Sequence, residues 1–146
     1  MAIRTNGADD LARFLNAQSR VYEQVVAELS AGRKQSHWMW FIFPQLKGLG
    51  HSAASEYFGI SDRSEAAAYG EHPILGTRLR ECTQLVLDVR DRRVEEILPY
   101  PDHLKFHSSM TLFMIAARDG SLFSKAIEQF FCGEPDRRTA KMLGPA

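Results

Sequence analysis

Apolar residues recur at intervals of three and four along most of the chain, which is the spacing of one face of an α-helix. Near the N-terminus this pattern predicts a helix that Asp9 and Asp10 begin and that reaches about Ala31, before Gly32. Gln18 lies on the apolar face, and a buried amide needs partners, so we expect it either to tie down a neighbouring loop or to line a pocket. The rest of that face consists of Leu11, Phe14, Leu15, Tyr22, Val25, Val26 and Leu29.

The same spacing, together with capping residues and helix breakers, predicts helices through the rest of the chain. Ser36 can cap a short helix that Pro44 ends, because the residue before a proline avoids helical angles. Asp102 can cap a long helix that is apolar nearly all round between Met110 and Ala117, and such a helix belongs in the middle of a domain. The expected ranges after the first helix are 36–43, 64–69, 73–89, 93–98, 102–118, 122–131 and 137–143.

The pattern as a whole predicts an all-α fold, because no pair of segments shows the period-two alternation that paired strands require. We expect a single compact multi-helix domain of about six to eight helices, with short loops and no significant sheet. Its expected extent is 9–146, preceded by a flexible N-terminal tail over 1–8. A length of 146 residues is close to the common size of one domain and is enough to bury a core.

Composition and charge narrow the classes of function. Eighteen basic and eighteen acidic residues give a formal net charge of zero, which argues against nucleic acid as a partner. The longest apolar run, 38–43, is far shorter than the roughly 20 residues that a membrane-spanning helix needs, and no export signal is visible. Two widely separated cysteines, Cys82 and Cys132, suit a reducing compartment. We therefore expect a cytoplasmic protein with no membrane partner and no cofactor.

The segment from Lys34 to Gln45 concentrates aromatic side chains between polar ends, and it holds both tryptophans of the chain. Such a segment is either the centre of a core or the wall of a pocket, and its spacing leaves both interpretations open. As a pocket wall it suits a flat, partly charged ligand, and His37 exchanges a proton near neutral pH. The candidate ligand-binding residues are Gln18, Lys34, His37, Trp38, Trp40 and Gln45.

A second polar group lies on the long helix expected over 102–118, where Lys105, Ser108 and Ser109 share one face. A serine beside a desolvated lysine can serve acyl transfer. Small hydroxyls also let two helices approach closely or bond a carbonyl one turn back, and this alternative is the commoner one. The catalytic candidates are therefore His37, Lys105, Ser108 and Ser109.

Two histidines on the same helix raise the question of a metal site. His103 and His107 are four residues apart, which is close enough to share one ion. No glutamate stands between them as in a metalloprotease helix, and no cysteine cluster completes a ligand set. We therefore expect surface histidines and no metal.

Five segments occur in one order along the chain. They are His-Trp-Met-Trp-Phe-Ile-Phe-Pro-Gln (37–45), Gly-Leu-Gly (48–50), His-Pro-Ile-Leu-Gly-Thr-Arg-Leu (72–79), Ser-Ser-Met-Thr-Leu-Phe (108–113) and Phe-Phe-Cys-Gly-Glu-Pro-Asp-Arg-Arg-Thr (130–139). Together they resemble the domain-of-unknown-function family 1810, a group of small bacterial proteins. The resemblance covers about 10–143 and implies a mainly helical single domain. It implies no activity, cofactor or catalytic residue.

These observations favour a small-molecule binding domain or enzyme whose pocket lies between the aromatic segment and the helix that carries Lys105. Lys34 and Lys105 would meet an anionic group of a nucleotide-like or other anionic ligand, and Trp38 or Trp40 would stack on it. The alternative is a non-catalytic protein–protein interaction module, which requires Trp38 or Phe41 to be exposed. The pattern leaves the oligomeric state open.

Overall fold

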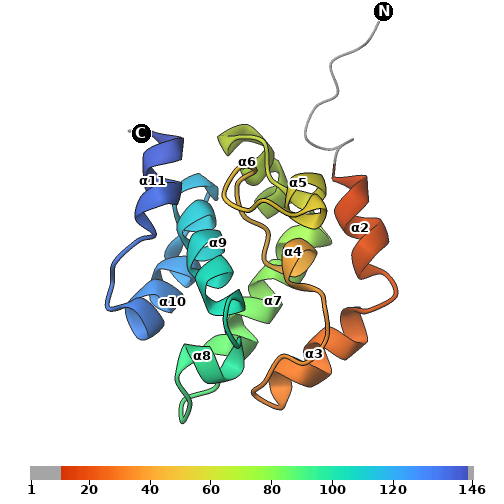
Figure 1. The fold of residues 1–146 in the computed structure, drawn as a ribbon, viewed down its shortest axis with the longest axis vertical. Coiled ribbons are helices and arrows are strands. Elements are labelled where there is room, and N and C mark those ends of the chain that lie inside the picture. Colours follow the sequence, from red (N-terminus) through yellow and green to blue (C-terminus); the bar gives the residue numbers. More distant parts are fainter. Residues whose placement is uncertain (1–10, 145–146) are drawn as a thin grey trace, which may run out of the picture.

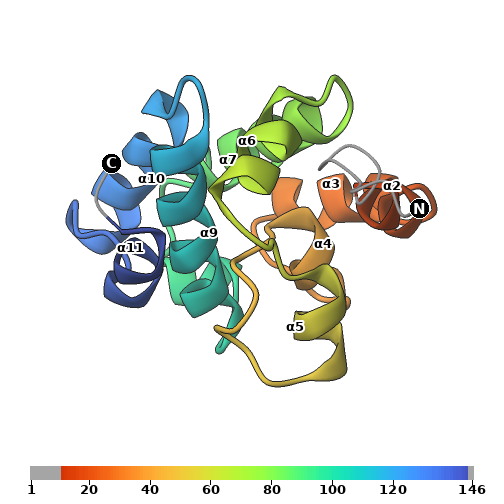
Figure 2. The ribbon, with the colours of Figure 1, turned by 90° about the horizontal axis from the view of Figure 1, so that it is seen from above.

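The helices of this chain are arranged around one central helix, as Figures 1 and 2 show from two directions. The computed structural model describes residues 11–144, where an isolated bridge between Leu46 and Ile60 is the only β-pairing. The helices in this range are α2 (Ala12–Gln18), α3 (Tyr22–Ser30), α4 (Met39–Ile42), α5 (Ala53–Phe58), α6 (Arg63–Glu71), α7 (Leu75–Leu87), α8 (Val94–Ile97), α9 (Asp102–Ala116), α10 (Ser121–Phe131) and α11 (Arg137–Leu143). The central helix is α9, which contacts α6, α8, α10 and α11. The expected tail over 1–8 and the expected caps Asp9 and Asp10 lie outside the described residues.

The all-α class is confirmed, but residues 11–144 form ten helices where six to eight were expected. One addition is α5, which is too short to show a repeating apolar stripe and was not predicted. Its start is nevertheless marked in the sequence by Ser52, whose side chain accepts a hydrogen bond from the backbone N–H of Ser55 (3.1 Å).

The other addition arises because the first expected helix is interrupted after Gln18, which separates α2 from α3. Gln18 is buried, and its side-chain amide donates to the carbonyl of Phe41 (2.8 Å) and to the hydroxyl of Tyr69 (3.1 Å). The side chain of Ser19 then donates to the carbonyl of Asn16, a local bond that competes with continuation of the helix. The turn lets α2 pack on α4 while α3 packs on α7.

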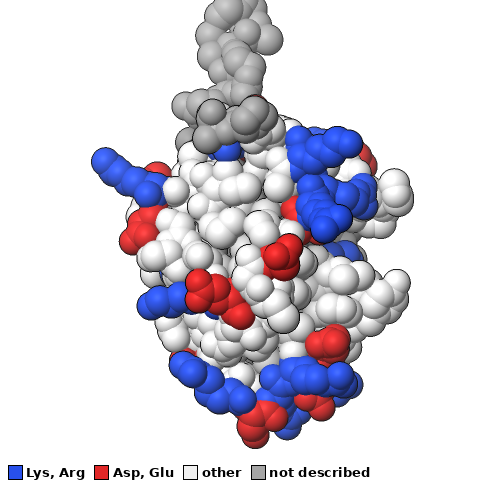
Figure 3. Space-filling view, turned by 90° about the vertical axis from the view of Figure 1, so that its left-hand side faces the viewer, with Lys and Arg blue, Asp and Glu red and all other residues white. Residues whose placement is uncertain are grey.

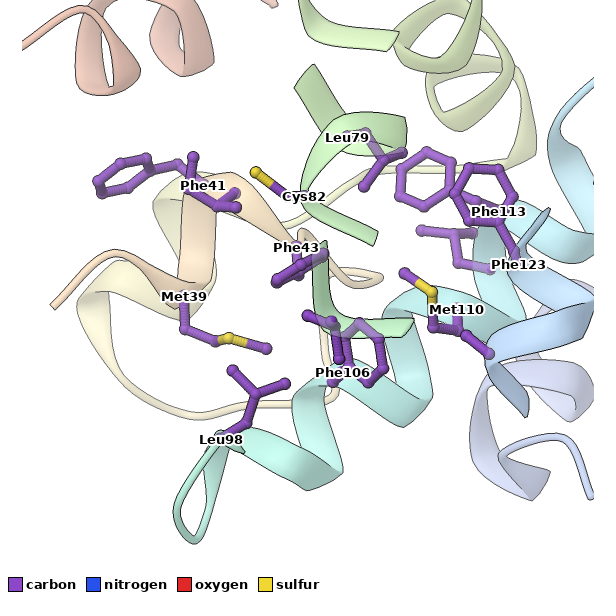
Figure 4. Packing of buried hydrophobic residues seen from close by; sticks show 14 of the residues in the cluster. Met39, Phe41, Phe43, Leu79, Cys82, Leu98, Phe106, Met110, Phe113 and Phe123 are labelled. Atoms are coloured by element: carbon purple, nitrogen blue, oxygen red, sulfur yellow. The ribbon is translucent and has the colours of Figure 1, made fainter. Parts of the chain in front are cut away.

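One hydrophobic core extends through the described residues, and α9 is buried within it from Ser108 to Phe113. Figure 4 shows Phe43, which ends α4, meeting Phe106 of α9, with their ring centroids 4.9 Å apart. Phe113 packs in turn against Phe123 of α10 (5.8 Å), so aromatic contacts connect three helices. Although α9 is apolar in its middle, none of the helices in 11–144 is long and apolar enough to cross a membrane.

A buried carboxylate, that of Glu28 in α3, holds the segment that connects α3 to α4. Its oxygens accept the backbone N–H groups of Gln35 (2.7 Å) and Ser36 (3.0 Å). They also accept the indole N–H of Trp38 (2.9 Å), the amide of Gln24 (2.9 Å) and the hydroxyl of Ser36. The prediction that Ser36 caps a helix was therefore wrong. Because Glu28 takes its hydroxyl, α4 begins later and without a side-chain cap.

The same hydrogen bonds set the charge of Glu28. Burial by itself raises the pKa of this carboxyl, but hydrogen bonds from Ser36, Gln35 and Gln24 outweigh burial. The pKa falls from its usual value of 4.5 to about 2. The carboxylate is therefore ionised at neutral and mildly acidic pH, and donors of the chain itself satisfy its charge.

Replacing Glu28 with glutamine should lower the free energy of unfolding near neutral pH by roughly 2–3 kcal/mol, since an amide nitrogen would face backbone donors. The folded-state pKa lies below the unfolded value, so the contribution of Glu28 is fully present above about pH 4.5 and is lost as pH falls toward 2. Urea unfolding curves of the wild type and E28Q over this pH range measure both effects.

Glu23 is the matched control, because it is exposed on the same helix. E23Q should change the free energy of unfolding by less than about 0.5 kcal/mol. If the wild type and E28Q lost stability in parallel below pH 4.5, the role assigned to the Glu28 carboxylate would be wrong.

Candidate ligand-binding site

A groove of about 300 Å³ lies where the segment after α4, the first turns of α9 and the start of α11 meet. This volume is at the lower end for small-molecule sites in proteins. In Figure 3, Lys and Arg side chains gather over α11, and the surface below them is hollowed. The polar lining residues are Gln45, Lys105, Ser108, Asp136 and Arg138, and the larger apolar ones are Leu49, Pro101 and Leu104.

A much smaller pocket of about 10 Å³ adjoins the groove, because Gln45 and Lys105 line both hollows. It has room for about one water molecule, so the surrounding rings already fill most of it. Its other side-chain walls are Met39, Trp40, Phe43, Ser55 and Phe58. The groove and this pocket together are called the Lys105 cleft below.

Backbone pairing fixes the wall of the cleft that follows α4. The N–H of Ile60 donates to the carbonyl of Gln45 (2.9 Å), and the N–H of Lys47 donates to the carbonyl of Ile60 (2.8 Å). Gly50 lies so close to α5 that a Cβ at this position would overlap the hydroxyl of Ser55. Gln45 is therefore held at the cleft by its own backbone, and the wall requires glycine at residue 50.

On the opposite side of the groove, Asp136 joins α11 to α9. Its carboxylate caps α11 by accepting the N–H (3.0 Å) and the hydroxyl (2.6 Å) of Thr139. The same carboxylate accepts the hydroxyl of Ser108 (3.3 Å), and the N–H of Asp136 donates to the hydroxyl of Thr111 (2.8 Å). This junction brings Arg138 to the rim of the groove.

Asp102 lies between the two lysines that the sequence singled out. It is the first residue of α9 rather than its side-chain cap, because both of its oxygens face lysines. Its Oδ2 is 2.8 Å from Nζ of Lys34, and its Oδ1 is 3.9 Å from Nζ of Lys105. The anionic group that both lysines face in the structure is therefore a carboxylate of the chain itself.

The two tryptophans have different surroundings. Trp38 is buried, donates to Glu28, and has Nζ of Lys34 lying 5.1 Å from its ring centroid. Trp40 is half-buried and lines the small pocket, with Nζ of Lys105 lying 5.0 Å from its ring centroid. Within the described residues, the indole N–H of Trp40 has no hydrogen-bond partner. The aromatic segment thus supplies core at Trp38 and cleft wall at Trp40.

The structure brings together about half of the site residues proposed from the sequence. Lys34 does not line the cleft, but it pairs with Asp102, which in turn contacts Lys105. Gln18, Trp38 and Ser109 are buried away from the lining, and His37 is exposed outside it. The candidates that line the cleft are Trp40, Gln45, Lys105 and Ser108.

The polar face of α9 does not form a reactive serine–lysine pair. The hydroxyl of Ser108 donates to the carbonyl of Leu104 (3.2 Å) and to Asp136, and no hydrogen bond within 11–144 joins it to Lys105. Ser109 is fully buried, and its hydroxyl has no partner among the described residues. A serine nucleophile needs a base within hydrogen-bond reach, so this arrangement suits binding better than acyl transfer.

The two histidines of α9 have separate structural surroundings. Nε2 of His107 lies 2.6 Å from the carbonyl of Glu134, and its ring stacks on Phe131 with centroids 3.9 Å apart. His103 instead packs beside Tyr100 (6.0 Å). Residues 11–144 contain no group of three or more histidines, cysteines or acidic side chains that could hold a metal ion. His107 therefore fixes the turn between α10 and α11, which leads to the cleft.

Sequence reasoning did not select Asp102, Asp136 or Arg138 as site residues. A signal for Asp102 was available, since it stands three residues before Lys105 and side chains at that spacing share a helix face. Asp136 and Arg138 reach the groove only because α11 packs on α9, and no local pattern reports such a contact.

The sequence of residues 8–143 matches the family described as "Protein of unknown function (DUF1810)". The chain belongs to this family. The resemblance seen in its five ordered segments is thereby confirmed. Among solved structures, the fold is similar to the crystal structure of a conserved hypothetical protein from Mycobacterium tuberculosis, with 50% sequence identity and a TM-score of 0.92. That similarity covers 94% of this chain and 98% of the mycobacterial chain. No curated protein matches the chain.

Replacing Trp38 with phenylalanine should lower the free energy of unfolding by about 2–3 kcal/mol, because it removes buried ring volume and a donor to buried Glu28. W40F should cost less than about 1 kcal/mol, because Trp40 is half-buried and donates no hydrogen bond within the described residues. Urea unfolding followed by circular dichroism compares the two variants. Equal losses would contradict the division of this segment into core and cleft wall.

Proposed function

We propose that the chain binds a small anionic molecule in the Lys105 cleft. The observation that carries the proposal is the place of the Lys105 ammonium, where the polar groove meets the aromatic pocket. Its closest carboxylate oxygen, on Asp102, is 3.9 Å away, which is beyond hydrogen-bond distance. The ammonium therefore keeps donor capacity for a ligand, while Trp40 lies beneath it.

Other side chains of the groove support recognition of a phosphate or carboxylate with neighbouring hydroxyls. Arg138 adds a second positive charge at the rim, and the amide of Gln45 makes no hydrogen bond within residues 11–144. Asp136 uses Oδ2 for the contacts with α9 and α11, whereas its Oδ1 accepts no hydrogen bond among the described residues. That oxygen can accept a ligand hydroxyl, as a sugar would provide.

The shape of the cleft limits where a flat group can lie. The pocket beside Trp40 is too small for a ring, so the ligand occupies the groove, with its apolar part along Leu49, Pro101 and Leu104. A groove of about 300 Å³ suits a nucleoside monophosphate or a sugar phosphate better than a large dinucleotide. Nucleotide-like compounds are therefore the class to test first, with nucleoside monophosphates before the larger ADP-ribose derivatives.

The proposal is binding, with no reaction assigned, because Ser108 makes no hydrogen bond to Lys105 within residues 11–144 and His37 lies outside the cleft. A cytoplasmic location fits the two free cysteines, Cys82 and Cys132.

A protein-interaction role is the second candidate. The aromatic patch that this alternative required is absent, since Trp38 and Phe41 are buried. Leu104, with 48% of its surface exposed, nevertheless lines the groove, and Tyr100, with 77% exposed, directly precedes the lining residue Pro101. This alternative predicts that Y100A and L104A abolish a self-association visible by size-exclusion chromatography with light scattering, whereas ligand binding alone predicts that neither variant changes the oligomeric state.

The test uses three anions of increasing size in thermal-shift screening and isothermal titration calorimetry: inorganic pyrophosphate, AMP and ADP-ribose. We expect at least one to bind the wild type, and Lys105→Met to weaken that binding about tenfold or more because a charge-assisted contact is lost. Q45A should weaken it less, because a neutral hydrogen bond is lost.

Two variants serve as controls. Lys47→Met removes a charge from the same connecting segment, and H37A removes the exposed imidazole, but neither residue lines the cleft. Both should bind within about twofold of the wild type. If K47M and K105M weakened binding equally, attraction by general surface charge would replace the cleft as the explanation.

A further inference from the structure

We infer that Lys34 sets the anion affinity of Lys105 by holding the carboxylate of Asp102 away from it. The inference rests on the proposed function of the Lys105 cleft and adds a positioning residue that does not touch the ligand. Lys34 lines neither part of the cleft, so any effect it has on binding does not come from direct contact with the ligand.

The three side chains form an unequal bridge. Asp102 makes a close ion pair with Lys34 at 2.8 Å and a loose contact with Lys105 at 3.9 Å. The Lys34 side chain is only 8% exposed, against 17% for Asp102 and 22% for Lys105. The close pair is thus the better shielded one, where the attraction between opposite charges is stronger.

Lys34 is also held in place independently of Asp102. Its backbone N–H donates to the carbonyl of Ile97 (2.8 Å), and the residues after it are bound by Glu28. Its ammonium faces the ring of Trp38 as well as the carboxylate. The lysine is therefore a fixed charge that captures one oxygen of Asp102.

Asp102 has an alternative partner within reach. Asp102 and Lys105 are three residues apart on α9, and side chains at this spacing pair on a helix surface. Without Lys34, the carboxylate is free to close on Lys105, neutralise it and compete with an incoming anion. With Lys34 in place, the ammonium of Lys105 remains only loosely paired.

A simpler explanation is that Lys34 acts only as one more positive charge near the ligand, together with Arg138 and the exposed Arg33. The two explanations differ in their dependence on Asp102. A capturing lysine has no effect once Asp102 has lost its charge, whereas a general attractive charge acts regardless of Asp102. A double-mutant cycle of K34M and D102N separates them.

Two measurements are made on the wild type, K34M, D102N and K34M/D102N. The first is the dissociation constant of inorganic pyrophosphate, by calorimetry. The second is the rate of limited acetylation at Lys105 by acetic anhydride, measured by peptide mass spectrometry, since an amine engaged by a carboxylate is less accessible to the reagent. The acetylation measurement needs no ligand, so it tests the inference even if pyrophosphate does not bind and the proposed function fails.

We expect D102N to tighten pyrophosphate binding about three- to tenfold and K34M to weaken it by a similar factor. Lys105 should be acetylated faster in D102N and slower in K34M. In the D102N background, K34M should change neither quantity. K125M, an exposed lysine of α10, is the control and should match the wild type.

Two results would overturn the inference. One is an equal loss of affinity from K34M in the wild-type and D102N backgrounds, and the other is an acetylation rate at Lys105 that K34M leaves unchanged. The comparison of D102N with the double variant is decisive even if K34M alone does not fold. The double variant carries no charge at residue 34 or residue 102, so it leaves no unpaired carboxylate. Equal values in that pair support capture of the carboxylate, and weaker binding by the double variant refutes it.

Discussion

The carboxylate of Glu28 is the constraint on which the rest of this structure depends. The connection over 33–38 has no helix or strand, so its backbone donors need partners elsewhere, and Glu28 accepts two of them together with the indole of Trp38. The connection is also bound on its other side, where Ile97 accepts the N–H of Lys34. One irregular segment therefore determines both where α4 enters the core and where a buried ammonium stands beside α9.

The protein has no formal net charge, but its charged side chains are distributed unevenly over the surface. The formal charges of the whole chain cancel, yet Lys105 and Arg138 line one groove in which Asp136 is the only acid among the described lining residues. Asp136 supplies one negative charge against two positive ones, so it offsets the two cations incompletely. In the proposed function, selectivity for anions thus depends on the contacts that Asp102 and Asp136 already make, as well as on the number of basic residues.

Sequence reasoning succeeded where the deciding interactions are local. The apolar stripes of α7, α9 and α10 predicted these helices close to their positions, and α9 lies at the centre as its apolar run required. Sequence reasoning failed where a contact with a residue distant along the chain determines the local structure. The break after Gln18 depends on Phe41 and Tyr69, which are 23 and 51 residues away. Glu28 likewise resembled any acidic residue of a helix surface until the folded connection covered it.

The backbone pairing between Gln45 and Ile60 has a consequence for how such a cleft diversifies. The stretch from 46 to 60, including α5, is closed at its base by this pairing, and its Phe58 packs against Phe14 and Phe41 of the core. Because loop-closure entropy grows slowly with length, a change in the length of such a closed stretch costs little closure entropy, provided that Gly50 and the packing of Phe58 are kept. The rim of the groove between these fixed points can therefore change in length while the scaffold that carries Lys105 stays the same.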